Sequence, residues 1–220
     1  MNHTKESFAK KRLRAGLLIQ GLNKLYSVAD CTLEFVNPLQ LLISTQLAAQ
    51  CTDERVNQVT VSLYEKYRDV SDFANADIAV FENEIRSTGF YHNKARNIIN
   101  CCRMLLTDFG GEVPRTLGEL LKLPGVGRKT ANLVLGDAFG VPGIVVDTHA
   151  GRLARRMGLT AFTDPEKVEF DLMKIIPEDN WTRFCHQLVL HGRAVCSARK
   201  ALCGSCSLSP DCPKINVEPK

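Results

Sequence analysis

Apolar side chains recur at helical spacing along almost the whole chain, and this periodicity restricts the possible folds more than any other feature. Ala95, Ile98, Ile99, Cys102 and Leu105 share one face of a predicted helix. Further helices are predicted over residues 39–50, 52–67, 128–139, 148–158, 164–176 and 180–191. Residues 143–146 alone look like a strand, and they are too few to build a sheet. We therefore predict an all-α protein of about ten helices.

The charge of the chain is concentrated at its two ends. The sequence has 220 residues, 45% of them hydrophobic, and a net charge of +4. Residues 1–14 carry five basic and one acidic side chain, and residues 182–220 carry six basic and two acidic side chains. If the two ends pack together, they form a positive face that can neutralise phosphates. Solvated tails without a polyanionic partner are the alternative.

No stretch has the character of a targeting or membrane-spanning segment. Residues 15–22 follow a basic start, but Gly16, Gln20 and Gly21 interrupt the apolar run that a secretory signal needs. No apolar run approaches the ~18 residues of a membrane span. We expect a monomeric, cytoplasmic and nucleoid-associated protein without membrane contact. In that reducing compartment its nine cysteines do not form a disulfide framework.

Four cysteines near the C-terminus have the spacing of a metal site. They follow the pattern C-x6-C-x2-C-x5-C and are Cys196, Cys203, Cys206 and Cys212. Both Zn²⁺ and an iron-sulfur cluster accept four thiolates, and the presence of only one close pair favours the cluster. The other cysteines lie in or beside apolar helical patterns and are expected to act as small hydrophobes: Cys31, Cys51, Cys101, Cys102 and Cys185.

A basic loop lies between the first two of these cysteines. It contains Arg199 and Lys200. A metal site would hold this loop in a fixed shape, in which the two cations can contact a phosphate backbone.

Residues 123–132, with the sequence LPGVGRKTAN, form a helix-hairpin-helix pattern. Gly125 and Gly127 allow the backbone to come close to a partner, and Arg128 opens the second helix. Unpaired N–H groups at a helix start favour phosphate oxygen. The pattern therefore indicates a contact with phosphate, with a corner that only packs two helices as the alternative.

A lysine and an aspartate in this part of the chain are candidates for catalysis. Lys129 lies in the first turn of its predicted helix, where the positive end of the helix dipole favours the free, nucleophilic amine. Asp147 lies about eighteen residues on, at the start of another predicted helix. There it can accept a proton or stabilise a cationic sugar. A phosphate contact for Lys129 and a helix cap for Asp147 are the alternatives.

These motifs together resemble the endonuclease III family of DNA glycosylases. The resemblance covers nearly the whole chain and rests on motifs in a fixed order: residues 49–53 (AQCTD), 123–132, 146–149 (VDTH), 190–193 (LHGR) and the four-cysteine pattern. It implies a helix-hairpin-helix DNA glycosylase fold with two helical domains and an active-site cleft between them. One domain would be residues 31–141, with six helices and the hairpin. Residues 1–30 and 142–220 would form the second, iron-sulfur domain.

The resemblance also implies an activity. A bifunctional DNA glycosylase/AP lyase of this family excises oxidised or ring-saturated pyrimidines from duplex DNA and cuts the strand 3′ to the abasic site by β-elimination. It implies that Lys129 attacks C1′ of the flipped nucleoside and that Asp147 assists deprotonation. The four C-terminal cysteines would ligate a [4Fe-4S] cluster. The partner would be double-stranded DNA that contains damaged pyrimidines or abasic sites.

Two further residues are assigned to DNA binding by the same resemblance. Gln50, at the end of the predicted helix 39–50, would fill the space left by the flipped base. Phe90 stands where relatives often carry Leu, in a loop that wedges into the base stack. Phe is among the apolar residues that proteins insert between base steps, so the wedge is retained, with an altered preference for the opposite base as the expected effect.

Two other functions compete with this interpretation. An adenine-specific mismatch glycosylase shares the fold and the cluster but lacks the Schiff-base lysine, so Lys129 argues against it. The chain also ends eight residues after Cys212, where that relative carries a further domain. A non-catalytic DNA-binding module would leave both Lys129 and Asp147 without a chemical role.

Overall fold

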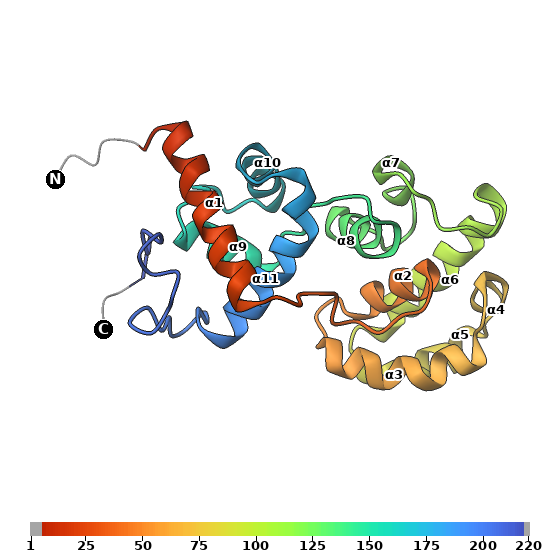
Figure 1. Cartoon of the computed structure of the whole chain (residues 1–220). Coiled ribbons are helices and arrows are strands. Elements are labelled where there is room, and N and C mark those ends of the chain that lie inside the picture. The colour runs from red at the N-terminus through yellow and green to blue at the C-terminus, as the bar shows by residue number, and fades with distance from the viewer. Residues whose placement is uncertain (1–5, 218–220) are drawn as a thin grey trace. The chain divides into compact units, whose positions relative to one another are not determined.

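The structure is a computed structural model and describes residues 6–217 of the chain (Figure 1). It confirms the prediction of an all-α protein. The elements are α1 (Phe8–Leu25), α2 (Pro38–Leu47), α3 (Asp53–Lys66), α4 (Val70–Ala74), α5 (Ile78–Glu84), the 3-10 helix η1 (Arg86–Thr88), α6 (Tyr91–Asp108), α7 (Leu117–Leu120), α8 (Arg128–Phe139), α9 (Thr148–Arg156), α10 (Pro165–Ile175), the 3-10 helix η2 (Glu178–Asn180) and α11 (Trp181–Ala194). Residues 143–146 belong to neither a helix nor a strand.

Short polar side chains begin most of these helices. Each accepts a hydrogen bond from the backbone N–H three residues further on, which satisfies one of the unpaired donors of the first turn. The capping residues are Ser7, Asn37, Thr52, Asp69, Asp77, Thr116, Asp147 and Asp164. Thr116 and Glu119 also bond through their side chains, as in a capping box.

The predicted helix over residues 39–50 is too long. α2 ends at Leu47, and the chain then turns, with the Ala49 N–H bonded to the Gln46 carbonyl and the Cys51 N–H bonded to the Ala48 carbonyl. Gln50 has a φ of 55°, which is outside the helical region. Propensity alone does not reveal this stop, because no Gly or Pro marks it.

The contacts divide the chain into two compact units. The central unit is Cys31–Val141, and the terminal unit contains the described residues up to Asp30 together with those from Pro142 onward. In the terminal unit α1 packs against α10 and α11, so the red and blue segments of Figure 1 lie side by side although they come from opposite ends of the sequence. Gly21 of α1 also contacts the side chain of Leu208.

Both basic ends therefore contribute to the terminal unit. Arg14 of α1 is not available to an external partner, because it bonds Glu6 and the carbonyl oxygens of Met157 and Gly158. Lys5 and Lys220, which were counted in the charge of the two ends, lie outside the described residues.

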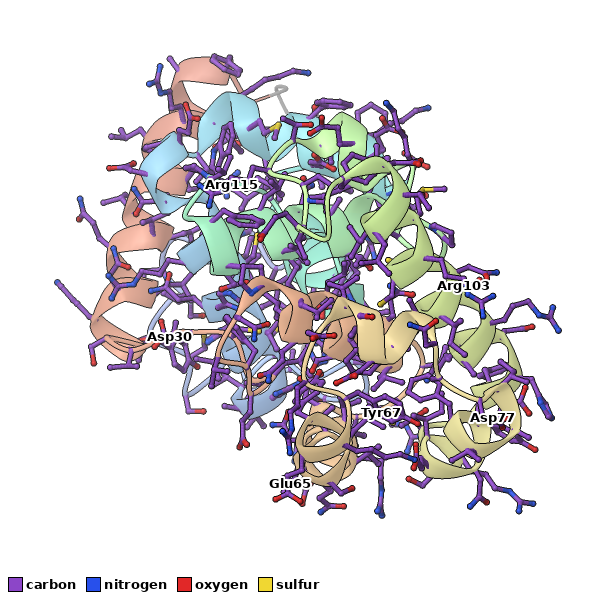
Figure 2. All side chains as sticks on the ribbon, turned by 90° about the vertical axis from the view of Figure 1, so that its right-hand side faces the viewer. Asp30, Glu65, Tyr67, Asp77, Arg103 and Arg115 are labelled. Carbon is purple, nitrogen blue, oxygen red and sulfur yellow. The ribbon has the colours of Figure 1, made fainter. Side chains whose placement is uncertain are left out.

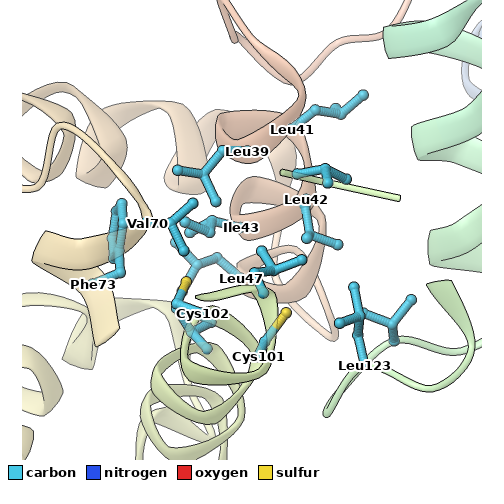
Figure 3. Close-up of a cluster of buried hydrophobic side chains, with 14 of the residues drawn as sticks. Leu39, Leu41, Leu42, Ile43, Leu47, Val70, Phe73, Cys101, Cys102 and Leu123 are labelled. Atoms are coloured by element: carbon cyan, nitrogen blue, oxygen red, sulfur yellow. The ribbon is translucent and has the colours of Figure 1, made fainter. Parts of the chain in front are cut away.

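The central unit is built around the apolar face of α2. Leu41, Leu42 and Leu47 are fully buried, and Figure 3 shows this face beside Cys101 and Cys102 of α6. In the same buried cluster, Tyr67 stacks on Phe73 at 5.0 Å between ring centroids, and Arg103 of α6 donates to the carbonyl of Ala74 at 2.9 Å. Figure 2 labels Tyr67 and Arg103 among the side chains of this unit.

The five cysteines outside the C-terminal pattern lie in apolar surroundings. Cys101, Cys102 and Cys185 are buried, and Cys31 and Cys51 are half-buried against the core of the central unit. Burial raises the pKa of the Cys101 thiol to about 12, so that this group stays protonated at neutral pH. Across residues 6–217 we find no helix with the length and apolarity that crossing a membrane requires.

Candidate active site

Buried apolar residues anchor the hairpin predicted over residues 123–132, which is a tight turn. Leu123 and Val126 are buried, and the Val126 N–H bonds the Leu123 carbonyl at 3.1 Å. Pro124, Gly125 and Gly127 form the solvent side of the turn. Both glycines are exposed there. The hairpin therefore presents its glycine backbone to solvent while its apolar residues fix it to the core.

Position 125 requires a glycine, because α2 and α6 pack close to it. Its φ is +76°, and a Cβ there would lie 2.5 Å from Gln46 Oε1 and 2.9 Å from the Cβ of Asn97. A larger residue would be strained by its backbone and would also collide with α2 and α6. Gly127 is different, because its φ of −92° is ordinary and a Cβ would meet nothing within 4 Å.

Lys129 is the second residue of α8 and is exposed at the start of that helix. Gly127 occupies the N-cap position, so no side chain there accepts from the first-turn N–H groups. The buried face of α8 carries Ala131, Val134 and Leu135. This face fixes the helix to the central unit and leaves the lysine amine accessible, with the hairpin glycines directly before it.

Asp147 caps α9 in the terminal unit. Its Oδ1 accepts the N–H of Ala150 at 2.7 Å, and the residue is half-buried. The second carboxylate oxygen has no part in this cap bond. The predicted cap role is therefore present, and it engages one oxygen and leaves the other for a second function.

Two arginines that the sequence analysis did not single out connect α9 to the cysteine segment. The Arg152 guanidinium donates to the carbonyl oxygens of Cys196 and Gly192, at 3.1 and 3.2 Å from its Nη2. Burial is the main cause of its lowered pKa, and Asp147 is close enough to act in the opposite direction. Arg156, one turn further on, donates to Ser197 O at 2.7 Å, Ala198 O at 3.0 Å and Cys196 Sγ at 3.3 Å.

In the sequence, little distinguishes these two arginines as structural residues. They are four residues apart, and so share a helix face, on a helix without an acidic residue in its first turn. Their contacts join the helix that carries Asp147 to the loop that begins at Cys196.

The four C-terminal cysteines line one pocket. Its other walls include Met157, Val195, Leu202 and Leu208, which are apolar, together with Arg156 and His191. The cysteines are close enough that Cys196 and Cys203 each raise the pKa of Cys206 and of Cys212, although burial is the largest cause in both cases. The prediction that these residues come together is consistent with this grouping.

Backbone hydrogen bonds act on the pKa of two of these thiols. Burial, the largest cause, raises the pKa of Cys206 and of Cys212, and the backbone of Leu208 and Ser209 opposes this at Cys206, as does that of Lys214 at Cys212. Such bonds stabilise a thiolate and so favour a bound cation. Over the part of the chain that the structure describes, no group of three His, Cys, Asp or Glu side chains is arranged to hold a single metal ion.

His191 connects the pocket to α1. Its Nδ1 lies 3.0 Å from the hydroxyl of Tyr26, and its Nε2 lies 3.5 Å from Cys206 Sγ. Burial lowers the pKa of His191, which favours the neutral ring. If the Tyr26 hydroxyl donates to Nδ1, the ring proton is on Nε2 and points at the sulfur.

The loop with Arg199 and Lys200 projects from this pocket. Cys196 and Ala201 form an antiparallel bridge at its base, and Ser197 Oγ donates to the Lys200 carbonyl at 2.6 Å. Arg199 and Lys200 are both exposed. The loop therefore has a fixed base and a basic tip.

Gln50 and Phe90 both lie in the central unit, at exposed turns with left-handed backbone. Gln50 has a φ of 55°, and Phe90 has a φ of 49° and is 62% exposed. Such a backbone costs a non-glycine residue about 1 kcal/mol or more and persists only where the surroundings enforce it. Two strained, exposed side chains of this kind are therefore candidates for a functional contact.

Comparison with known proteins identifies the family. The model of the family described as HhH-GPD superfamily base excision DNA repair protein matches residues 43–178. The chain belongs to this family. The match spans Gln50, Phe90, the hairpin and Asp147, and it ends before the four cysteines.

Within the family, the chain is similar to endonuclease III over almost its whole length. It is 50% identical to the endonuclease III of Synechocystis sp. over 218 residues, which cover 99% of this chain and 100% of that protein. A solved structure of a non-covalent endonuclease III–DNA complex matches with a TM-score of 0.88 and 45% identity, over 92% of this chain and 95% of that one. A trapped endonuclease III–DNA covalent intermediate matches with the same TM-score and identity, over 92% and 96%.

The matched residues include three of the motifs found in the sequence, at residues 49–53, 123–132 and 146–149. The relatives at this identity extend past residue 178, so the segment with the four cysteines belongs to the region that this chain shares with endonuclease III.

Proposed function

We propose that this protein is a bifunctional DNA glycosylase/AP lyase of base excision repair. Its substrates are oxidised or ring-saturated pyrimidines in duplex DNA, and abasic sites. The observation that carries the proposal is the exposed Lys129 in the first turn of α8, directly after a hairpin whose glycine backbone faces solvent. The similarity to a trapped endonuclease III–DNA covalent intermediate supports covalent chemistry by this family.

The reaction follows from an amine at this place. The free amine of Lys129 attacks C1′ of a flipped nucleoside, the C1′–N bond breaks, and the base leaves with a proton. The sugar ring then opens, because the C1′–O4′ bond breaks and O4′ takes up a proton while C1′ and the lysine nitrogen form an imine. The resulting imine acidifies the neighbouring C2′ proton. Loss of that proton expels the 3′ phosphate by β-elimination, and hydrolysis of the imine returns the lysine. Asp147 takes up a proton from the amine and stabilises positive charge on the sugar through the oxygen that is not used for the cap.

DNA contacts are assigned to exposed elements of each unit. The backbone of Gly125 and Gly127, with Arg128, binds phosphate at the hairpin. Arg199 and Lys200 bind phosphate from the loop of the terminal unit. Gln50 and Phe90 enter the base stack, where Gln50 hydrogen-bonds the base left without a partner and Phe90 separates neighbouring bases. The hairpin lies in the central unit and the four cysteines lie in the terminal one, which supports the domain roles proposed from the sequence.

A [4Fe-4S] cluster held by Cys196, Cys203, Cys206 and Cys212 is proposed as the cofactor. Four thiols in one pocket with apolar walls, two of them with a pKa that backbone hydrogen bonds lower, fit such a group. When bound, the cluster supplies a rigid base for the loop that carries Arg199 and Lys200. Iron and sulfide in equal amounts, with broad visible absorbance, are the expected analysis. A colourless protein with one zinc would contradict the assignment.

Borohydride trapping tests the enzymatic proposal. The protein is incubated with duplex DNA that contains one oxidised pyrimidine, and the reductant converts the imine to a stable covalent adduct. The native protein should give an adduct of shifted mobility, and Lys129→Gln should give none while DNA binding is retained. A Lys129→Gln protein that is still trapped would show that another amine is the nucleophile. Lys122→Gln, an exposed lysine seven residues earlier, serves as the matched control.

A further inference from the structure

One buried lysine in the central unit has no part in the proposed chemistry. Lys94, in the first turn of α6, is only 6% exposed. Its ammonium donates to the carbonyl of Leu47 at 2.7 Å and to the carbonyl of Thr88 at 2.8 Å. A lysine is almost never this buried unless it is paired. The partners of Lys94 are these two backbone carbonyls.

Both acceptors are the last residues of helices. Leu47 ends α2 and Thr88 ends η1. The final carbonyl groups of a helix lack partners within it and carry the negative end of the helix dipole. The ammonium of Lys94 therefore caps two helix ends at once. Burial lowers the pKa of Lys94, and the nearby Cys51 opposes this shift.

Each capped helix end leads directly into one of the strained turns. Gln50 follows Leu47 by three residues, and Phe90 follows Thr88 by two. An extended chain spans at most about 3.5 Å per residue, so each turn is within about 10 Å of its anchor. The backbone N–H of Lys94 also bonds the Phe90 carbonyl at 3.1 Å. Lys94 thus touches one turn directly and the other through Leu47.

We infer that Lys94 is a positioning residue, which holds the turn with Gln50 and the turn with Phe90 at a fixed spacing so that both side chains enter one opened base pair. The inference rests on the proposed function. It predicts that loss of the two bonds leaves the amine chemistry intact and impairs only the step in which a stacked base is displaced. A displacement of about 1 Å in such a contact can reduce a rate by about a hundredfold.

The test compares two substrates that differ in the need for base displacement. One is a duplex with a central oxidised pyrimidine, and the other is a single strand with one abasic site, in which there is no pair to open. Lys94→Met keeps the length of the side chain and removes the donors. We expect incision of the duplex to fall by about ten- to a hundredfold, and incision of the single strand to change less than about threefold. Lys66→Met, which removes an exposed cation of the same unit, should alter neither rate.

The outcomes separate the inference from the proposed function. Equal losses on both substrates would overturn the inference, because they indicate general damage to the enzyme, and so would an unchanged rate on the duplex. If the native protein incises neither substrate, the proposed function fails and the inference fails with it. If Lys94→Met does not fold, Lys94→Arg serves instead, because it retains a cation and presents its N–H groups in a wider fork that shifts both turns. The rate at which Lys94→Arg incises the duplex should fall, and the rate at which it incises the single strand should not.

A second measurement uses a double-mutant cycle. In a Gln50→Ala, Phe90→Ala background the two side chains that Lys94 positions are absent. Addition of Lys94→Met should then cost less than about threefold on the duplex, because residues that act through one another are not additive. A full additional loss in that background would show that Lys94 acts by another route.

Discussion

Gly192 of α11 lies directly against the ring of His149 in α9. A Cβ on Gly192 would come within 2.7 Å of His149 Nδ1 and 2.9 Å of Arg152 Nη2. The two residues belong to the motifs LHGR and VDTH, which are more than forty positions apart in the sequence. Their contact explains why a glycine is needed between His191 and Arg193, in a helix interior where glycine is otherwise unfavourable. It also joins the helix that Asp147 caps to the helix that leads into Cys196.

Gly192→Ala should therefore destabilise the protein. The flexible guanidinium of Arg152 can move aside, but the ring of His149 can move only together with the backbone of α9. Overpacking of this kind costs about 1–3 kcal/mol. Urea unfolding of the full-length protein measures the loss. Gly16→Ala is the matched control, because Gly16 lies in α1 with open space around it. It should raise stability by about 0.5–1 kcal/mol. A stable Gly192→Ala protein would show that α9 and α11 can separate at no cost.

The two roles of Asp147 can be separated by Asp147→Asn. Asn and Asp are similarly good N-caps, so the bond to the Ala150 N–H and the stability should change little. Turnover should fall by about 10²- to 10⁴-fold, because an amide does not accept a proton. Single-turnover cleavage of an oxidised duplex provides the rate, and thermal unfolding provides the stability.

Asp164→Asn is the control for this experiment. Asp164 caps α10 with the same bond, to the Lys167 N–H at 3.0 Å, and has no proposed catalytic role. Its substitution should leave turnover unchanged. If Asp147→Asn also turns over at the native rate, Asp147 is a cap and nothing more.

Much of this arrangement could be predicted from the sequence, because it is encoded locally. The helices follow from apolar spacing, α8 was predicted with its observed bounds, and the hairpin follows from the residues Pro124 to Gly127. Asp147 as a cap needed only its place before α9. Each of these features depends on neighbours within about four residues.

The features that were missed depend on contacts between distant residues. Lys94 bonds a carbonyl 47 positions away, and Arg156 bonds carbonyls 41 and 42 positions away. In the sequence each is an ordinary basic residue on a helix. The stop of α2 at Leu47 was missed for the same reason, since Lys94 caps that end from another helix. No local propensity records such a cap.

Gly127→Asp should weaken DNA binding while it stabilises α8. The position has room for a Cβ, and the new carboxylate can accept the first-turn N–H groups, a gain of a few tenths of a kcal/mol over Gly. It also places a negative charge where the hairpin is proposed to receive a phosphate. We expect the affinity for abasic duplex to fall by about tenfold or more, with a smaller loss at high salt. Fluorescence anisotropy at two salt concentrations measures both effects.

Gly127→Asn separates the charge from the cap. Asn caps as well as Asp and adds no charge, so its effect on affinity should be smaller and should not depend on salt. Equal affinities of the Asp and Asn proteins at low salt would count against a phosphate at this helix start.

Arg156→Met should loosen the proposed cluster site without a change to any ligand. The guanidinium bonds the carbonyl oxygens of Ser197 and Ala198 and the sulfur of Cys196. Met retains much of the apolar stem and removes every donor, and hydrogen bonds from a charged group contribute about 1.5–3 kcal/mol each. The loop from Cys196 to Ala201 should then open more often. Release of iron to a chelator, followed by visible absorbance, should accelerate by about tenfold or more.

Arg155→Met is the control for Arg156. Arg155 precedes it in the last turn of α9 and, within residues 6–217, donates no hydrogen bond to that loop. Its substitution removes the same charge and should leave iron release at the native rate. If both substitutions accelerate release equally, the net positive charge near the cysteines matters and the bonds to the loop do not. If neither does, the loop keeps its shape without Arg156, because the backbone bridge between Cys196 and Ala201 then suffices to close its base.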